Sequence, residues 1–172
     1  MKADIDATVT YPHPVQRVWA ALTSREALAA WLMPNDFELV VGHAFTLRTR
    51  PVPGFDGIVP CEVLELDPPT HMVWSWRGGN IDTTVTFTLE ATGPASTRLR
   101  MHQAGFHRLG AQLTRRILAG GFPRLLGRRL PASLDRVAGT TEATGATAAV
   151  HCAEGRRAYR GVFGRWRQSP TR

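Results

Sequence analysis

Apolar and polar residues alternate along residues 1–11, which is the pattern of a strand with one buried face. Beyond Pro14 the apolar residues recur at helical spacing as far as residue 32. Ser24 lies within this stretch and is a residue type that caps helix N-termini, so it divides the stretch into two short helices. Pro14 suits the first turn of the first helix, because its missing N–H has no partner to lose there. A strand and a helix pair are therefore predicted for residues 1–32.

Six further stretches alternate with a period of two, and turn residues separate them. They are residues 37–41, 43–50, 58–66, 71–77, 81–90 and 96–103. The first two are predicted to form a hairpin around Gly42. Because each stretch has one apolar and one polar face, together they predict an antiparallel sheet that is covered on one side and exposed to solvent on the other.

A long apolar stripe at helical spacing follows between residues 109 and 137, and we expect this helix to cover the sheet. The stripe consists of Phe122, Leu126, Leu130, Leu134 and Val137. Gly120-Gly121 and Pro123 are expected to break or bend the helix, leaving one segment near 109–118 and another near 122–137. A second proline inside the later segment is expected to kink it.

Composition separates a globular part from a basic tail. The chain has 172 residues, 43% of them hydrophobic, and a formal net charge of +7. Residues 1–138 hold 15 basic and 12 acidic residues, a balance of +3, whereas residues 139–172 hold six arginines and two glutamates, a balance of +4. The globular part is nearly neutral for its size, which argues against a nucleic-acid-binding domain. The tail lacks periodicity and large apolar clusters, so it is predicted to be flexible.

Several classes of protein are excluded by what the sequence lacks. No stretch approaches the roughly 18 apolar residues of a membrane span, and the N-terminus has no apolar core typical of a secretory signal. Cys61 and Cys152 are too few and too far apart for a disulfide framework or a zinc site. We therefore expect a reduced cytoplasmic protein without a metal or a cofactor.

Candidate catalytic residues are few. His102 and His107 are five residues apart with no third ligand at suitable spacing, so neither a metal site nor acid–base chemistry is favoured there. Glu62 is the one weak candidate for a general acid or base, provided that it shares the covered face of its strand with Leu64 and Leu66. Cys61 is expected to be a small core residue. The sequence contains no nucleophile-elbow, phosphate-loop, dinucleotide or zinc-protease motif.

Short motifs in a fixed order carry a family resemblance across residues 5–137. They are Pro14-Val-Gln-Arg-Val-Trp-Ala-Ala-Leu-Thr23, Leu28-Ala-Ala-Trp-Leu, Gly42-His-Ala-Phe45, Glu62-Val-Leu-Glu-Leu-Asp-Pro-Pro69, Val73-Trp-Ser-Trp76, Thr83-Val-Thr-Phe-Thr-Leu89, Thr97-Arg-Leu-Arg-Met-His102 and Gly105-Phe106. The chain resembles the small bacterial proteins related to the activator of the heat-shock-protein ATPase, in the START-like (SRPBCC) superfamily. The resemblance implies an α+β helix-grip fold, in which a curved antiparallel sheet wraps around a long C-terminal helix and two short helices follow the first strand. Residues 1–138 would then form a helix-grip ligand-binding domain.

Such a fold typically leaves an apolar cavity between the sheet and the long helix. The residues expected to line it are Trp31, near its mouth, and Phe45, Leu47, Trp74, Trp76, Val85, Phe87, Leu99, Met101, Phe122 and Leu126. The plainer interpretation of each is ordinary core packing. As a group they favour non-catalytic binding of a small hydrophobic or aromatic molecule. The superfamily also implies two alternatives, an enzyme of the polyketide cyclase or hydrolase type and a co-chaperone-like regulator of an ATPase.

Two surface features bear on possible binding partners, and neither identifies one. The arginines of the long helix form a basic face, which is usually solvated but could contact an anionic partner or a membrane surface. They are Arg115, Arg116, Arg124, Arg128 and Arg129. A long exposed sheet edge would permit a homodimer, whereas a chaperone partner is not favoured.

Overall fold

The structure is a computed structural model that describes residues 4–79, 81–107 and 111–141. The chain divides into two compact units, Met1–Val137 and Ala138–Arg172, and the fold considered below is that of the first. Residues 139–172 were predicted to be a flexible tail; residues 139–141 are instead helical, and residues 142–172 lie outside the described residues. In the part that the structure describes, no helix has the length and apolarity needed to span a membrane.

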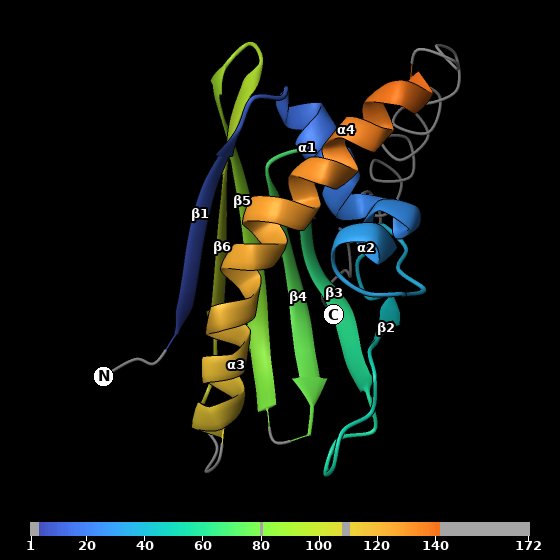
Figure 1. The fold of residues 1–172 in the computed structure, drawn as a ribbon, viewed down its shortest axis with the longest axis vertical. Coiled ribbons are helices and arrows are strands. Elements are labelled where there is room, and N and C mark those ends of the chain that lie inside the picture. The colour runs from blue at the N-terminus through green and yellow to red at the C-terminus, as the bar shows by residue number, and fades with distance from the viewer. Residues whose placement is uncertain (1–3, 80, 108–110, 142–172) are drawn as a thin grey trace, which may run out of the picture. The chain divides into compact units, whose positions relative to one another are not determined.

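A six-stranded antiparallel sheet forms the body of the first unit (Figure 1). Its strands are β1 (Ile5–Tyr11), β2 (Ala44–Arg48), β3 (Ile58–Asp67), β4 (His71–Gly78), β5 (Ile81–Gly93) and β6 (Ser96–Ala104). The spatial order is β1-β6-β5-β4-β3-β2, so β1 and β2 are the edge strands. Burial alternates along the strands, and the buried side chains form one core cluster with those of the helices. The predicted sheet with one covered face is confirmed.

The helices lie on that covered face. They are α1 (Val15–Thr23), α2 (Arg25–Trp31), α3 (Ala111–Arg124), a π-helical turn η1 (Leu125–Arg129) and α4 (Leu130–Thr141). Figure 1 shows α3, η1 and α4 running as one long helix diagonally in front of the sheet, with α1 and α2 toward its upper end. This arrangement confirms the predicted helix-grip fold.

The helix pair begins and ends as the sequence indicates, with one difference. The Ser24 hydroxyl oxygen accepts a hydrogen bond from the backbone N–H of Ala27 at 3.3 Å, so Ser24 is the predicted N-cap of α2. Pro14 is the N-cap of α1 and not a residue of its first turn. Its carbonyl oxygen accepts the first helical hydrogen bond, from Val18 at 3.2 Å.

The predicted hairpin around Gly42 is wrong. Residues 37–41 form no strand, and β2 pairs along its whole length with β3. Phe37 is buried against Phe45, with ring centroids 5.1 Å apart, while the apolar residues that follow it are exposed. The alternation in this segment therefore did not reflect burial of one face, and the segment instead forms a loop held by side-chain hydrogen bonds.

The predicted break at Gly120-Gly121 is also wrong, because α3 continues through both glycines and through Pro123. The irregularity lies one turn later, in η1, where the N–H of Leu130 donates to the carbonyl of Leu125, five residues earlier. Pro131 has no N–H to donate to the turn that precedes it, which favours a local change of winding here.

Candidate functional site

The predicted ligand-lining side chains come from the face of the sheet under the long helix and, for Trp31, Phe122 and Leu126, from the helices. All eleven are buried, none is more than 3% exposed, and they belong to one core cluster. Trp74 makes ring contacts with Phe45 at 5.4 Å and with Phe87 at 5.0 Å between centroids, and the helix reaches this face through Phe122, 5.9 Å from Trp76. The structure thus brings the predicted residues together in one core cluster between the sheet and the helices.

Trp31 has a structural role in this arrangement. It is fully buried, and its indole N–H donates a hydrogen bond to the carbonyl oxygen of Ala21 at 2.9 Å. Since its one polar group already has a partner within the helix pair, Trp31 presents only its ring to the core.

Two polar atoms on the covered face are buried without a hydrogen-bond partner. They are the indole Nε1 of Trp74 and the side-chain Oε1 of Gln103, both in residues with no exposed surface. The strand register places the two residues in one row across the sheet, with Val85 between them, because Trp74 pairs with Val85 and Val85 pairs with Gln103. A buried donor and a buried acceptor therefore flank one valine on an otherwise apolar surface. Native proteins leave few such groups unpaired, so each calls for an explanation.

The orientation of the Gln103 amide follows from its neighbour. The Thr83 hydroxyl donates to the carbonyl oxygen of Trp76 at 3.0 Å, so its oxygen is left as an acceptor for the Gln103 Nε2, 2.9 Å away. An amide turned the other way would place two acceptors against each other. The Gln103 carbonyl oxygen is consequently the free end of the side chain.

Gly105 allows β6 to approach β5 closely beside this pair. Its φ is +108°, and a Cβ at this position would lie 3.0 Å from the carbonyl oxygen of Asp82 and 3.2 Å from the Cα of Thr83. Only glycine adopts this conformation without strain. The tight passage helps to hold Gln103 against Thr83.

Sequence reasoning missed Gln103, although a signal was present. Gln103 has the same strand parity as Leu99 and Met101, which were assigned to the covered face. A polar residue that continues an inward-facing series is the pattern that would have identified it.

Two hollows among the described residues lie on the opposite, solvent-facing side of the sheet. The larger of the two is lined by Asp6, Thr8, Thr88, Glu90, Arg98 and Arg100. Its charged groups are already paired, Arg98 with Glu90 at 3.0 Å and Arg100 with Asp6 at 3.3 Å. Neither of these two hollows lies between the sheet and the long helix, where a cavity was predicted.

The weak catalytic candidate does not point into the core. Val59, Cys61 and Val63 supply the buried face of β3, so Glu62 lies on the other face and is half-buried. The assumption that Glu62 shares the covered face with Leu64 and Leu66 is wrong, because Leu64 is exposed. Burial raises the pKa of the Cys61 thiol to about 12, which disfavours the reactive thiolate.

The histidines form no metal site. Among the described residues no three histidine, cysteine, aspartate or glutamate side chains are grouped so as to hold a metal ion. His102 lies on the solvent-facing side, where its Nδ1 is 3.0 Å from the Asp6 carboxylate. That contact helps to hold the pKa of Asp6 below its usual value.

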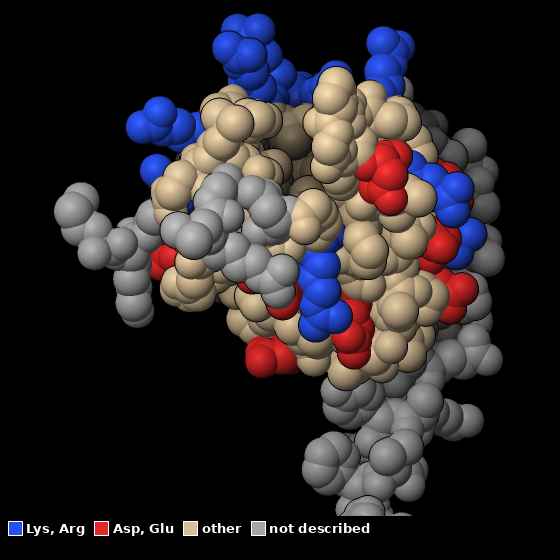
Figure 2. All heavy atoms as spheres, turned by 90° about the horizontal axis from the view of Figure 1, so that it is seen from below, with Lys and Arg blue, Asp and Glu red and all other residues tan. Residues whose placement is uncertain are grey.

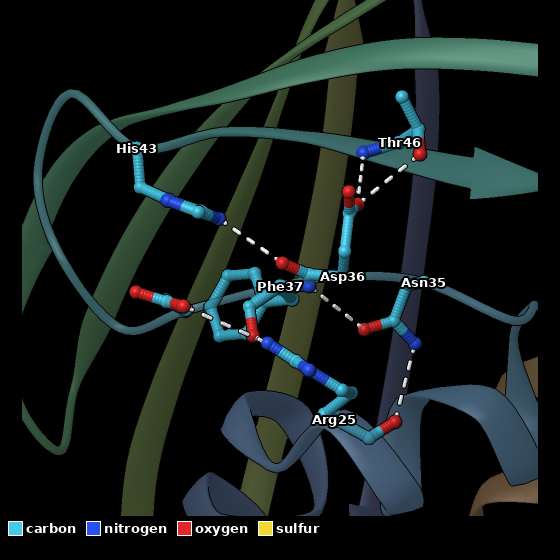
Figure 3. Close-up of polar contacts among 7 residues, drawn as sticks. Arg25, Asn35, Asp36, Phe37, His43 and Thr46 are labelled. Carbon is cyan, nitrogen blue, oxygen red and sulfur yellow. Dashed lines mark hydrogen bonds and ion pairs between the residues drawn. The ribbon is translucent and has the colours of Figure 1, made fainter.

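A network of side chains fixes the loop between α2 and β2 over the end of the core (Figure 3). The Asp36 carboxylate accepts hydrogen bonds from the N–H of Thr46 at 2.6 Å and from its hydroxyl at 3.1 Å, and the N–H bond lowers the pKa of Asp36. On the other side the Arg25 guanidinium donates to the carbonyl of Phe37 at 3.4 Å. The network positions Phe37 so that its ring packs 5.5 Å from that of Trp74. This loop was not foreseen as part of the site.

Comparison with known proteins assigns the chain to a family. Residues 12–135 match the family model described as Activator of Hsp90 ATPase homolog 1-like protein. No curated protein matches the chain. Among solved structures, protein MLL2253 from Mesorhizobium loti is 32% identical, with a TM-score of 0.66, and the match covers 76% of this chain and 97% of that one.

Two more distant structures share the fold. DynU16, a protein of the dynemicin biosynthetic locus, is 22% identical with a TM-score of 0.64, and the match covers 78% of this chain but 48% of that one. The Aha1 dimer from Colwellia psychrerythraea is 19% identical with a TM-score of 0.60, over 72% of this chain and 90% of that one. At these identities the likeness concerns the fold alone.

Proposed function

We propose that this chain, which belongs to the Activator of Hsp90 ATPase homolog 1-like family, binds a small, mostly apolar molecule between the covered face of its sheet and α3. The ligand would lie across Val85 and the aromatic side chains around it. It would carry one hydrogen-bond acceptor toward Trp74 and one donor toward Gln103.

The observation that supports this proposal is the pair of unpaired polar atoms on the covered face. Burying an amide oxygen or an indole N–H without a partner costs about 1–3 kcal/mol each. Apolar residues at positions 74 and 103 would avoid that cost. A ligand that supplies both partners would recover it, and the two atoms would fix its orientation.

Entry requires α3 to move away from the sheet. Between Ala111 and Phe122, which are both buried, the apolar contacts of this helix with the core come from the partly buried Leu118 and Ala119. Seen from the lower end of the molecule (Figure 2), the surface is hollowed in the upper part of the view, on the side where the long helix lies. A molecule inserted beneath this part of α3 would displace partly buried side chains and no fully buried one.

Binding can be measured with N-phenyl-1-naphthylamine, a neutral fluorescent probe that has one N–H donor. We expect saturable binding by the wild type and a roughly three- to tenfold weaker affinity in Gln103→Met, since one neutral hydrogen bond is lost. Gln112→Met is the matched control because Gln112 is exposed on α3. Native mass spectrometry of freshly purified protein would in addition reveal a co-purifying molecule.

Two outcomes would contradict the proposed binding site. Absence of saturable probe binding by the wild type, or equal affinity of the wild type and Gln103→Met, would exclude this site.

The two alternative functions gain no support from particular residues. A cyclase or hydrolase needs an acid or base facing the ligand, and Glu62 lies on the other side of its strand. Co-chaperone activity is suggested only by the family description. Binding without catalysis therefore remains the proposal.

A further inference from the structure

The outer side of α3 combines exposed arginines with exposed aliphatic side chains. Leu113, Arg116, Ile117, Gly120 and Arg124 each lie three or four residues from another member of the set, so they form a single stripe on one side of the helix, here called the outer stripe. All five are exposed, and Leu113 and Ile117 are 69% and 66% exposed. Two branched aliphatic side chains about one turn apart thus project into solvent on the same side of the helix as two arginines.

No acidic residue balances this charge within α3 or η1. The sequence has no aspartate or glutamate between Glu90 and Asp135, and η1 continues the helix with exposed Arg128 and Arg129. In Figure 2 several arginine side chains lie along the upper edge of the view, the side of the long helix, whereas the acidic side chains lie lower.

Three arginines of the sheet differ from Arg116 and Arg124 of the helix. Arg77, Arg98 and Arg100 each form an ion pair, with nitrogen–oxygen distances of 3.0 to 3.3 Å. Within the described ranges, Arg116 and Arg124 take part in no ion pair. The positive charge of the outer stripe is therefore available to an external anion.

We propose that the outer stripe docks on the surface of an anionic lipid bilayer. Guanidinium groups would contact headgroup phosphates, while Leu113 and Ile117 would enter the boundary between headgroups and acyl chains. The two aliphatic side chains favour this partner over a nucleic acid, because a phosphate backbone offers them no apolar environment and the stripe has no aromatic ring on which a base could stack. This inference does not rest on the proposed ligand site, which lies on the inner side of the helix.

Co-sedimentation of the full chain with vesicles tests the proposal. We expect binding to vesicles of phosphatidylcholine and phosphatidylglycerol in equal parts, little binding to phosphatidylcholine alone, and a decrease with added salt. Arg116→Gln/Arg124→Gln should weaken binding on the order of tenfold. Leu113→Ser/Ile117→Ser should weaken it by a similar factor, because the apolar contribution is removed without any change of charge.

Matched variants keep the test specific. Arg48→Gln/Arg50→Gln removes the same charge from exposed positions at the β2 end of the sheet, and Val40→Ser/Val52→Ser removes two exposed aliphatic side chains elsewhere. Both controls should bind as the wild type does, and far-ultraviolet circular dichroism should show that all variants are folded.

Three results would overturn the proposal. One is equal binding to neutral and anionic vesicles. A second is an equal loss of vesicle binding in Arg116→Gln/Arg124→Gln and in Arg48→Gln/Arg50→Gln, which would assign the binding to net charge. The third is unchanged vesicle binding by Leu113→Ser/Ile117→Ser. If this variant also binds a single-stranded oligonucleotide as tightly as the wild type does, a nucleic acid would be identified as the partner.

Discussion

The hydroxyl of Tyr11, in the first strand, donates a hydrogen bond of 2.7 Å to the carbonyl oxygen of Leu126, in the π-helical turn of the long helix. The bond is buried and joins residues 115 positions apart. In the winding of η1 the carbonyl of residue 126 would accept from the N–H of residue 131, and residue 131 is proline. Tyr11 therefore supplies the donor that Pro131 lacks.

Replacement of Tyr11 by phenylalanine should destabilise the protein by about 1–3 kcal/mol, because the Leu126 carbonyl would stay buried without a donor. The ring and its packing are retained, so the change isolates the hydroxyl. Urea denaturation followed by tryptophan fluorescence measures the effect. Thr92→Val removes a hydroxyl from an exposed pair and should change the free energy of unfolding by less than about 0.5 kcal/mol. A Tyr11→Phe variant as stable as the control would contradict the role given to this bond.

The same relationship predicts coupling between Tyr11 and Pro131. Pro131→Ala restores a backbone N–H that can reach the turn, so the Tyr11 hydroxyl should matter less in its presence. We expect the effect of Tyr11→Phe to be smaller by at least about 0.5 kcal/mol in the Pro131→Ala background, as a double-mutant cycle would measure. Equal effects in the two backgrounds would show that the two residues act independently.

Stability should fall in alkaline solution because of Cys61. Burial raises the pKa of this thiol to about 12 from its ordinary value of 9.0, although Arg77 partly opposes the shift. Above pH 9 the unfolded chain loses this proton while the folded chain keeps it, so the stabilisation is present below pH 9 and is lost as the pH rises toward 12. The slope for one such group approaches about 1.4 kcal/mol per pH unit.

Urea denaturation at several pH values between 8 and about 10 measures this slope, where titration of Cys61 precedes that of Tyr11. Cys61→Ala should reduce the slope, and Cys152→Ser serves as the control for the second cysteine. Identical slopes for the wild type and Cys61→Ala would rule out this source of pH dependence.

In acid, the loop network at Asp36 should weaken. The N–H of Thr46 and, to a smaller extent, its hydroxyl hold the pKa of Asp36 below its ordinary value of 3.8. The stabilisation is therefore present above pH 3.8 and is lost as the pH falls through the lower pKa of the folded state. Because the carboxylate is exposed and screened by solvent, the contribution is less than about 1 kcal/mol.

Asp36→Ala should remove this contribution and make the loop over Phe37 easier to cleave with protease near neutral pH, while Asp67→Ala on the β3–β4 turn should not. Limited proteolysis and denaturation below about pH 4 provide the two measurements. Equal protection of the loop in both variants would show that Asp36 does not hold it.

Local periodicity was sufficient for most of the fold. Strands β4, β5 and β6 alternate because one face is buried, and the Ser24 cap depends only on neighbouring residues, so both could be predicted. The loop at residues 37–41 could not be predicted, because the sequence does not distinguish apolar side chains that become exposed from those that become buried. The position of the helix irregularity depends on Tyr11, which is distant in sequence, and no local rule includes it.

The position of the candidate site could be predicted from the sequence, but the hydrogen bonding of its polar groups could not. Parity placed Trp74 and Val85 on the covered face, where they lie. Whether the indole N–H of Trp74 and the amide oxygen of Gln103 find partners depends on what the other strands and the helix bring to them. That information is absent from any single strand.

The π-helical turn lets the long helix hold one residue more than a regular helix would over the same span. Because the wider turn absorbs the extra residue, the side chains before and after it keep their faces, and Phe122, Leu130 and Leu134 are all buried against the sheet. Deleting one residue from 125–129 should therefore return the helix to regular winding and leave Leu130 and Leu134 on the core side. The carbonyl of Leu126, which the wide turn leaves open for the Tyr11 hydroxyl, is what such a deletion would change. The extra residue of the helix should thus be inherited together with a tyrosine at position 11.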